Sequence, residues 1–300
     1  MAQDARTAQT GAYLRLLLAR PGAPRSVWEK VATAPGSGEV DVDAVCEVLR
    51  HHGASETELA TTVRAALDGT DVEPRTLERI IEAFDLGPRN ATRLRDLLSG
   101  SDSVRVITTG ALAALYRPGD APRLQTLALH EMHTLGPDGL PAEHQTIQVI
   151  KSTVDGLTAY PYRFDTDELV VEVVRGGRVG DTYRVTGHYF GVDILLDRPL
   201  ALGETALIHF RTTFLYRTPP PPEFRRGVRG TMHDVTMWLR FDPQRLPARI
   251  FLGRWDRLDD PTLVESQNLE LDDDYSAQAR FESVTDAIVG FGWEWGDETD

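Results

Sequence analysis

Cysteine, lysine and long apolar runs are all scarce in this chain of 300 residues. The single cysteine, Cys46, excludes an intramolecular disulfide framework. It falls among Val42, Val45 and Val48 at helical spacing, which favours a packed core thiol over a reactive one. Lys30 and Lys151 are the only lysines, so nearly every basic side chain is an arginine.

No apolar run approaches the roughly 20 residues that a membrane-spanning helix needs. The apolar stretch from Tyr13 to Ala19 is too short for a secretory signal and lacks a basic start and a small-residue cleavage site. We therefore expect a cytoplasmic protein with no membrane partner.

Basic residues are also relatively few: 46 acidic residues outnumber 32 basic ones, which gives a formal net charge of −14. Residues 1–100 carry 12 basic against 15 acidic side chains, so the excess of acid is concentrated in the later part of the chain. This balance argues against generic nucleic-acid binding, which relies on clustered Lys and Arg to neutralise phosphates.

Residues 1–100 are predicted to form a compact bundle of six short helices. Apolar spacing and end signals agree at most boundaries, with glycines at the ends and Ser-x-x-Glu capping boxes at Ser26/Glu29 and Ser55/Glu58. The first helix should cover Ala12 to Ala19, the second Ser26 to Thr33, and the third should end at Gly53. The fourth should turn inward Leu59, Val63, Ala66 and Leu67 and close at Gly69, while the fifth and sixth begin at Pro74 and Pro88.

One part of this bundle resembles a known DNA-binding family. Ser55, Glu58, Leu59 and Ala60 form a Ser-x-x-Glu-Leu-Ala run, followed by Pro74, Leu77, Ile80, Ile81, Ala83, Phe84 and Leu86. Over about a sixth of the chain, this order resembles the phage-repressor (xenobiotic-response-element) type of helix-turn-helix. Only eight residues separate Ala60 from Gly69, about two turns fewer than a recognition helix with its preceding turn occupies. The resemblance therefore implies a degenerate helix-turn-helix.

Two interpretations of the helical half stay open. In the first, short amphipathic helix pairs form a module for protein contacts, and the arginines are solvated. In the second, the chain is a sequence-specific DNA-binding transcriptional regulator, and the phosphate contacts are Arg64, Arg75, Arg79, Arg89 and Arg93. The whole layout, including the β-rich half, also resembles uncharacterised proteins of high-GC bacteria.

After Gly100 the pattern changes to alternation, β-branched residues and turn pairs, which are typical of strands. Residues 101–122 are interpreted as a connector, with a strand at Ser103 to Thr108 and an irregular passage at Gly110 to Tyr116. The fold class is therefore α+β with two domains, in which the helical bundle precedes a predominantly antiparallel β-sandwich over residues 123–300. Its strands are predicted at Leu124 to Leu135, Glu143 to Thr153, Tyr160 to Phe164, Glu168 to Val174, Thr182 to Thr186, Tyr189 to Leu196, Thr205 to Tyr216, Thr231 to Phe241, Arg249 to Trp255, Val264 to Leu271, Ser276 to Ser283 and Ala287 to Trp295.

The proline-rich loop from Thr218 to Arg229 is the candidate partner-binding segment. Four consecutive prolines are expected to hold an extended arm that presents one apolar anchor and a local positive charge, namely Phe224, Arg225, Arg226 and Arg229. The simpler alternative is a surface crossover in which Phe224 packs inward.

Glu131, His133 and His144 form the only candidate metal site. A hairpin turning at Gly136 to Pro141 would place His133 opposite His144, with Glu131 on the same face. Two histidines and a carboxylate can hold zinc or iron, which would make the protein a metal-dependent enzyme. The alternative is an exposed polar patch on one face of the sheet.

The sequence contains no nucleophile elbow, phosphate-binding glycine loop or calcium loop. We therefore predict a non-enzymatic regulatory or adaptor protein with no cofactor, which binds another protein or ligand through its β-sandwich. A protein partner or self-association is expected. A DNA-binding regulator and a metal-dependent enzyme are the alternatives.

Overall fold

In the computed structural model, the chain is an α+β protein whose helices precede a β-rich half. The structure describes residues 2–33, 36, 39–54, 59–108, 123–166, 168–186, 189–216, 219–257 and 261–296. The chain divides into two compact units, residues 1–106 and 107–300. Of the helices in the described ranges, none combines the length and apolarity needed to cross a membrane.

Six helices lie in the described part of the first unit: α1 (Ala2–Ala19), α2 (Ala23–Glu29), α3 (Val42–His51), α4 (Leu59–Asp68), α5 (Pro74–Ala83) and α6 (Gly87–Ser99). The predicted inward side chains of α4 are all buried. Gly69 and Gly100 adopt positive φ angles of 68° and 84° at the ends of α4 and α6, where a left-handed residue terminates a helix. The fourth, fifth and sixth predicted helices are therefore confirmed, the sixth with its start shifted by one residue.

The first helix is longer than predicted, because it passes through Gly11 rather than starting after it. A Cβ at Gly11 would lie 2.6 Å from the Ala66 carbonyl oxygen, so glycine there permits close packing of α1 on the end of α4. Upstream, the hydroxyls of Thr7 and Thr10 donate to carbonyls of the preceding turn. A glycine that signals a helix boundary in sequence is here a site of close contact between helices.

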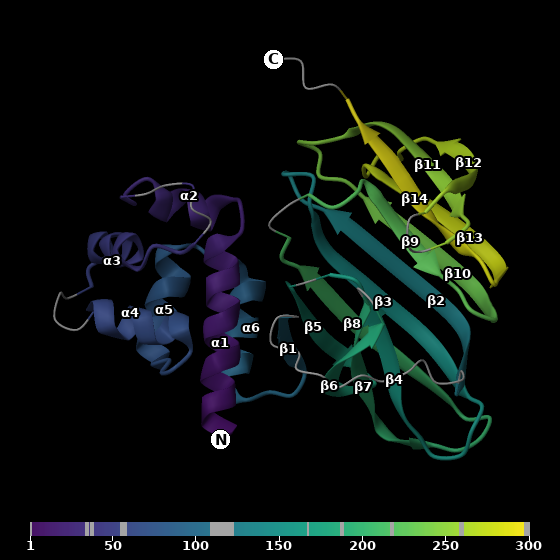
Figure 1. The fold of residues 1–300 in the computed structure, drawn as a ribbon, viewed down its shortest axis with the longest axis horizontal. Helices are drawn as coiled ribbons and strands as arrows, with labels where there is room; N and C mark the ends of the chain where they lie inside the picture. Colours follow the sequence, from purple (N-terminus) through teal and green to yellow (C-terminus); the bar gives the residue numbers. More distant parts are fainter. Residues whose placement is uncertain are drawn as a thin grey trace. The chain divides into compact units, whose positions relative to one another are not determined.

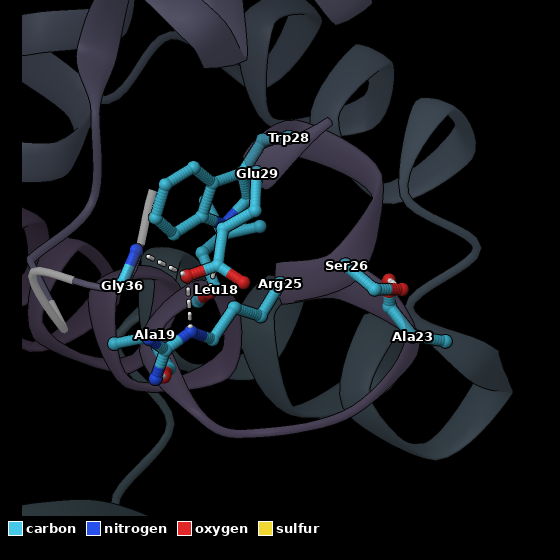
Figure 2. Close-up of polar contacts among 8 residues, drawn as sticks. All are labelled: Leu18, Ala19, Ala23, Arg25, Ser26, Trp28, Glu29 and Gly36. Carbon is cyan, nitrogen blue, oxygen red and sulfur yellow. Dashed lines mark hydrogen bonds and ion pairs between the residues drawn. The ribbon is translucent and has the colours of Figure 1, made fainter. Parts of the chain in front are cut away.

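The turn between α1 and α2 is fixed by polar contacts to backbone groups (Figure 2). The buried Trp28 indole N–H donates to the Leu18 carbonyl at 2.9 Å. The expected Ser26/Glu29 capping box is wrong: Ser26 donates to the Ala23 carbonyl, and Glu29 accepts from Arg25. The helix begins three residues before Ser26, so that hydroxyl lies inside the first turn. The Ser55/Glu58 box lies outside the described residues.

The arginines proposed as phosphate contacts do not share one exposed surface. Arg64, Arg75 and Arg89 are exposed and Arg79 is half-buried, but Arg93 is only 2% exposed. A buried guanidinium cannot reach a DNA phosphate, so Arg93 is removed from the predicted contacts. It is one of the buried residues of α6, together with Ala91, Leu94 and Leu97.

Strand positions follow the sequence pattern closely. The strands are β1 (Val104–Thr108), β2 (Leu124–Leu135), β3 (Pro141–Ser152), β4 (Leu157–Phe164), β5 (Glu168–Arg175), β6 (Gly177–Thr186), β7 (Tyr189–Leu200), β8 (Thr205–Phe214), β9 (Glu223–Gly227), β10 (Thr231–Arg240), β11 (Pro247–Trp255), β12 (Leu263–Leu269), β13 (Ser276–Thr285) and β14 (Ile288–Trp295). Every predicted strand is present, and β9 is an addition. The irregular passage expected at Gly110 to Tyr116 lies outside the described residues.

The strands form three sheets (Figure 1). The largest has the order β1-β5-β8-β3-β2-β10-β13, and the smaller ones have the orders β12-β11-β14-β9 and β4-β7-β6. In the large sheet, β10 runs parallel to β2, whereas β3 is antiparallel to both β2 and β8. The strands β4 and β9 are therefore terminal strands of their respective sheets.

Both small sheets pack on one face of the large sheet. Residues that pair across neighbouring strands lie on the same face of the sheet. One such row runs from β8 through β3 and β2 to β10 and consists of Ile208, Gln148, Leu129 and Val235. The three-stranded sheet packs against β5 and β8 through one apolar cluster, which includes Phe210, Val171 and Ile194. The four-stranded sheet packs against β2 and β10 through a second cluster, which includes Met237, Phe291 and Trp293.

The Trp28 contact gives the first prediction. Trp28→Phe should lower the free energy of unfolding of the helical unit by about 1–3 kcal/mol, because the Leu18 carbonyl loses its donor within the core. The measurement is urea unfolding followed by circular dichroism at 222 nm. Trp238→Phe is the matched control, because Trp238 is 39% exposed, and it should change stability by less than about 0.5 kcal/mol. Equal effects of the two substitutions would contradict the role given to Trp28.

Candidate functional site

The inner face of the large sheet is apolar on either side but polar in its middle. His133 of β2 pairs with His144 of β3, and Glu131 pairs with Thr146, so these four side chains share the inner face. The predicted pairing of the two histidines is confirmed. The patch is not exposed, however, because all four residues are at most 5% accessible. The sheets that pack on either side cover what would otherwise be a solvent-facing patch.

The part of the predicted arm that follows the four prolines forms a strand. Residues 223–227 form β9, which pairs with β14 along its whole length, and Phe224 is buried. Phe224 stacks on His133 with ring centroids 4.6 Å apart and contacts His144 edge-on at 5.0 Å. Phe224 and Arg226 therefore point inward, so the expectation that an arm presents them is wrong, and the alternative in which Phe224 packs inward is confirmed. Arg229 is exposed beyond the strand, and Thr218 lies outside the described residues.

A glycine in β14 allows the backbone of β9 to pack closely against that strand. Gly290 is opposite Arg225, and a Cβ there would collide with the carbonyl oxygen of Phe224. The prolines before β9 contribute backbone contacts, since the Trp293 N–H donates to the Pro222 carbonyl at 3.0 Å. Local sequence thus holds β9 where its inward side chains reach the large sheet.

A buried ion pair joins the two sets of candidate residues. Arg226 Nη1 lies 3.3 Å from Glu131 Oε1, and His144 Nε2 lies 3.3 Å from the same oxygen. His144 Nε2 is also 3.0 Å from the Thr146 hydroxyl. The residues predicted to bind a partner and those predicted to bind a metal therefore lie in one cluster.

Side chains of β4 complete the cluster from the third sheet. A hydrogen bond joins Arg226 to Tyr160, and the hydroxyl of Thr212 donates to that of Tyr162 at 3.2 Å. Burial raises the pKa of the Tyr162 phenol well above its ordinary value. Arg226 thus links β9, β4 and β2, one strand from each sheet.

Several polar atoms in this cluster have no hydrogen-bond partner within the protein. They are Glu131 Oε2, both ring nitrogens of His133, Gln148 Oε1 and Arg226 Nε, and all are inaccessible to solvent. The amide nitrogen of Gln148 does donate, to the Thr126 hydroxyl at 2.9 Å. Buried polar atoms without partners are rare in folded proteins and cost about 1–3 kcal/mol each, so this concentration marks the cluster as a candidate site.

The charge states of the cluster follow from its contacts. Burial alone would raise the pKa of Glu131, but Arg226 and His144 outweigh it and hold that pKa below its ordinary value. Burial, aided by His144, lowers the pKa of His133 to about 3. At neutral pH the cluster therefore contains ionised Glu131, cationic Arg226 and neutral His133.

The proposed metal ligands lie close together without forming a metal centre. In the described ranges, no group of three His, Cys, Asp or Glu side chains is arranged to hold an ion. The guanidinium of Arg226 lies against Glu131, and Phe224 stacks on His133. A cation and an aromatic ring thus take the positions next to two of the three proposed ligands.

A cleft of about 2030 Å³ adjoins the cluster within the β-rich unit. Its lining includes Glu131, His133 and His144 of the large sheet, Tyr160 of β4, and Phe224 and Arg226 of β9. Seven arginines and eight carboxylates line it, so it carries no strong charge of either sign. The cleft therefore adjoins the polar cluster around Glu131, and its walls include the two terminal strands β4 and β9.

The sequence pattern did not indicate Tyr160, Tyr162 or Gln148 as members of the site, and it indicated Arg226 as an exposed partner contact rather than a member of this cluster. One sequence signal for β9 was available. Phe224 and Val228 are four residues apart, which fits a strand whose alternate residues face inward, and both are buried in the structure. The four prolines before β9 and its length of five residues made this strand hard to recognise in the sequence.

Breaking the ion pair from one side gives the second prediction. Arg226→Met should lower the free energy of unfolding by about 3–5 kcal/mol, because Glu131 is left charged and buried. Urea unfolding followed by tryptophan fluorescence provides the measurement. The double variant Glu131→Leu, Arg226→Met should recover most of the loss, and Arg249→Met, which breaks an exposed pair with Glu294, should cost at most about 1 kcal/mol. A double variant no better than the single one would contradict this account.

The buried His133 gives the third prediction, on pH dependence. Histidine in the unfolded chain has a pKa near 6.5, whereas the folded pKa of His133 is about 3. Between these values the unfolded state takes up a proton that the native state excludes, so stability is lost as pH falls. From pH 7 to 4.5 the wild type should lose about 2 kcal/mol more than His133→Gln. His130→Gln, at an exposed position on the same strand, is the control, and identical pH profiles for all three proteins would refute the assignment.

Comparison with known proteins assigns no family. No family model and no curated protein matches the chain. Among solved structures, a protein from Parabacteroides distasonis described as a candidate protease is 8% identical, with a TM-score of 0.34 over 60% of this chain and 37% of its own. A mutant two-domain M1 zinc metallopeptidase bound to L-arginine is 14% identical, with a TM-score of 0.27 over 56% of this chain and 42% of its own. The chain spans less than half of either protein, and similarities at these TM-scores assign no activity.

Proposed function

We propose that the protein is a non-enzymatic adaptor or regulatory protein of the cytoplasm, which binds a partner protein in the cleft of its β-rich unit. One observation carries the proposal: the 2030 Å³ cleft adjoins a buried cluster with five polar atoms that lack hydrogen-bond partners. A bound group can satisfy such atoms at little further desolvation cost, since they are already out of water.

The size and charge of the cleft favour a protein segment as its occupant. Small-molecule pockets measure roughly 300–1,000 Å³, so this cleft has at least twice the volume that a single small ligand needs. The near balance of arginines and carboxylates argues against a polyanion such as nucleic acid. In this proposal the two layers of the predicted sandwich provide the walls, and the helix-turn-helix-derived bundle provides a second contact surface.

A peptide-display selection tests the proposal. Random 12-residue peptides are selected on the full-length protein, and the best are measured by fluorescence anisotropy. We expect micromolar dissociation constants that weaken at least tenfold in Thr158→Trp, because the indole occupies space at an exposed cleft position.

The matched control is Leu202→Trp, since Leu202 is 68% exposed and does not line the cleft. Its affinities should equal those of the wild type. If no peptide is enriched, or if the selected peptides bind both variants equally, the cleft is not the binding site and the proposed function fails.

A further inference from the structure

We propose that the occupant of the cleft is an extended peptide that adds as a strand to β9 and inserts one Asn or Gln side chain into the cluster around Glu131. This inference rests on the proposed function and specifies the chemistry of the partner. Two independent observations carry it, one from the backbone at the edge of the cleft and the other from the buried side chains.

The first observation is that two terminal strands, β4 and β9, line the same cleft. A terminal strand directs half of its backbone N–H and C=O groups away from its own sheet, and these groups can pair with an incoming chain. In the described part of the chain, no strand pairs with the outer edge of either one. An extended peptide in the cleft would therefore lie beside ready-made hydrogen-bonding edges.

Hydrogen-bond geometry identifies β9 as the better edge. The Val228 N–H donates to the Ala287 carbonyl, so alternate residues before it, including Arg226, direct their backbone groups toward β14. Gly227 falls between them and directs its N–H and C=O outward. On β4, Pro161 has no N–H, which removes a donor from that strand. A peptide therefore finds more regular pairing along β9 than along β4.

The second observation concerns the chemistry of the buried cluster. Glu131 Oε2 and Gln148 Oε1 can accept hydrogen bonds, Arg226 Nε can donate one, and neutral His133 can do either. A carboxamide offers both an N–H₂ donor and a carbonyl acceptor, so one side chain can satisfy groups of both kinds.

Charge excludes the ionised side chains. Glu131 and Arg226 already neutralise each other in a buried setting. A lysine or glutamate from the peptide would bring an uncompensated charge into that setting, which is strongly unfavourable. An apolar side chain would leave the unpartnered atoms as they are. Among neutral polar side chains, a carboxamide has two N–H donors where a hydroxyl has one, so Asn or Gln can satisfy more of the unpartnered atoms.

The experiment uses the tightest peptide whose binding is weakened by Thr158→Trp, synthesised with single N-methyl groups at successive positions. Strand addition predicts that methylation weakens binding at least tenfold at every second residue and has little effect between them, because alternate amides face the sheet. Gly227→Pro should weaken the parent peptide similarly, whereas Gly227→Ala, which keeps the N–H, should not. A methylation profile without a period of two overturns strand addition.

Side-chain recognition is tested on the same peptide. Replacing its Asn or Gln by Ala, Lys or Glu should weaken binding at least tenfold, and Gln148→Met should weaken the parent peptide while leaving the alanine peptide unchanged. Peptides that bind in the cleft without a required carboxamide overturn the inference and leave the proposed function standing. Peptides that ignore Thr158→Trp overturn both.

Discussion

The ion pair between Glu131 and Arg226 constrains the rest of the β-rich unit. A carboxylate in the middle of a buried sheet face is tolerated only with a compensating charge, because desolvation of a lone ion costs several kcal/mol. That charge comes from β9, so β9 must lie over the large sheet with Arg226 inward. Gly290 allows β14 to hold it there. The ion pair thus sets which side chain of β9 faces the large sheet, while the apolar cluster beneath holds the four-stranded sheet in place.

The same constraint explains why the cleft lies between the two small sheets. Apolar clusters under the three-stranded and four-stranded sheets pack well against the two sides of the large sheet. Between them the inner face carries Glu131, Thr146 and Gln148, which cannot join either apolar cluster without losing hydrogen bonds. Aromatic stacking of Phe224 on His133 covers part of this stripe, and Tyr160 and Tyr162 cover it from the other side. The strip between the two apolar clusters is therefore polar and buried, and it adjoins the cleft.

Most strands were predictable from sequence, because alternation and turn pairs act locally. The pairing of His133 with His144 was predictable too, since a short hairpin loop fixes its own register. Burial of that pair was not, because it depends largely on Phe224 of β9, which lies far later in the chain. Four prolines concealed β9 for a similar reason: its strand character comes from pairing with β14 rather than from its own composition. Gly11 shows the same limit in the helical unit, where a contact with Ala66 gives a helix-breaking residue a packing role.

The unpartnered polar atoms of the candidate site lower the stability of the fold, but they are also groups that a bound partner can pair with. Each unpartnered polar atom in the cluster lowers the stability of the folded chain by about 1–3 kcal/mol, and apolar replacements of similar shape would avoid that cost. Local departures from otherwise consistent packing are expected where a protein binds something. Among the described residues, five of the eight buried polar side-chain atoms without a partner belong to this cluster, so the departure is concentrated between the two apolar clusters. A partner that supplies the missing hydrogen bonds would recover the lost stability as binding energy, and the rigid sheets on either side would hold the cluster in place for it.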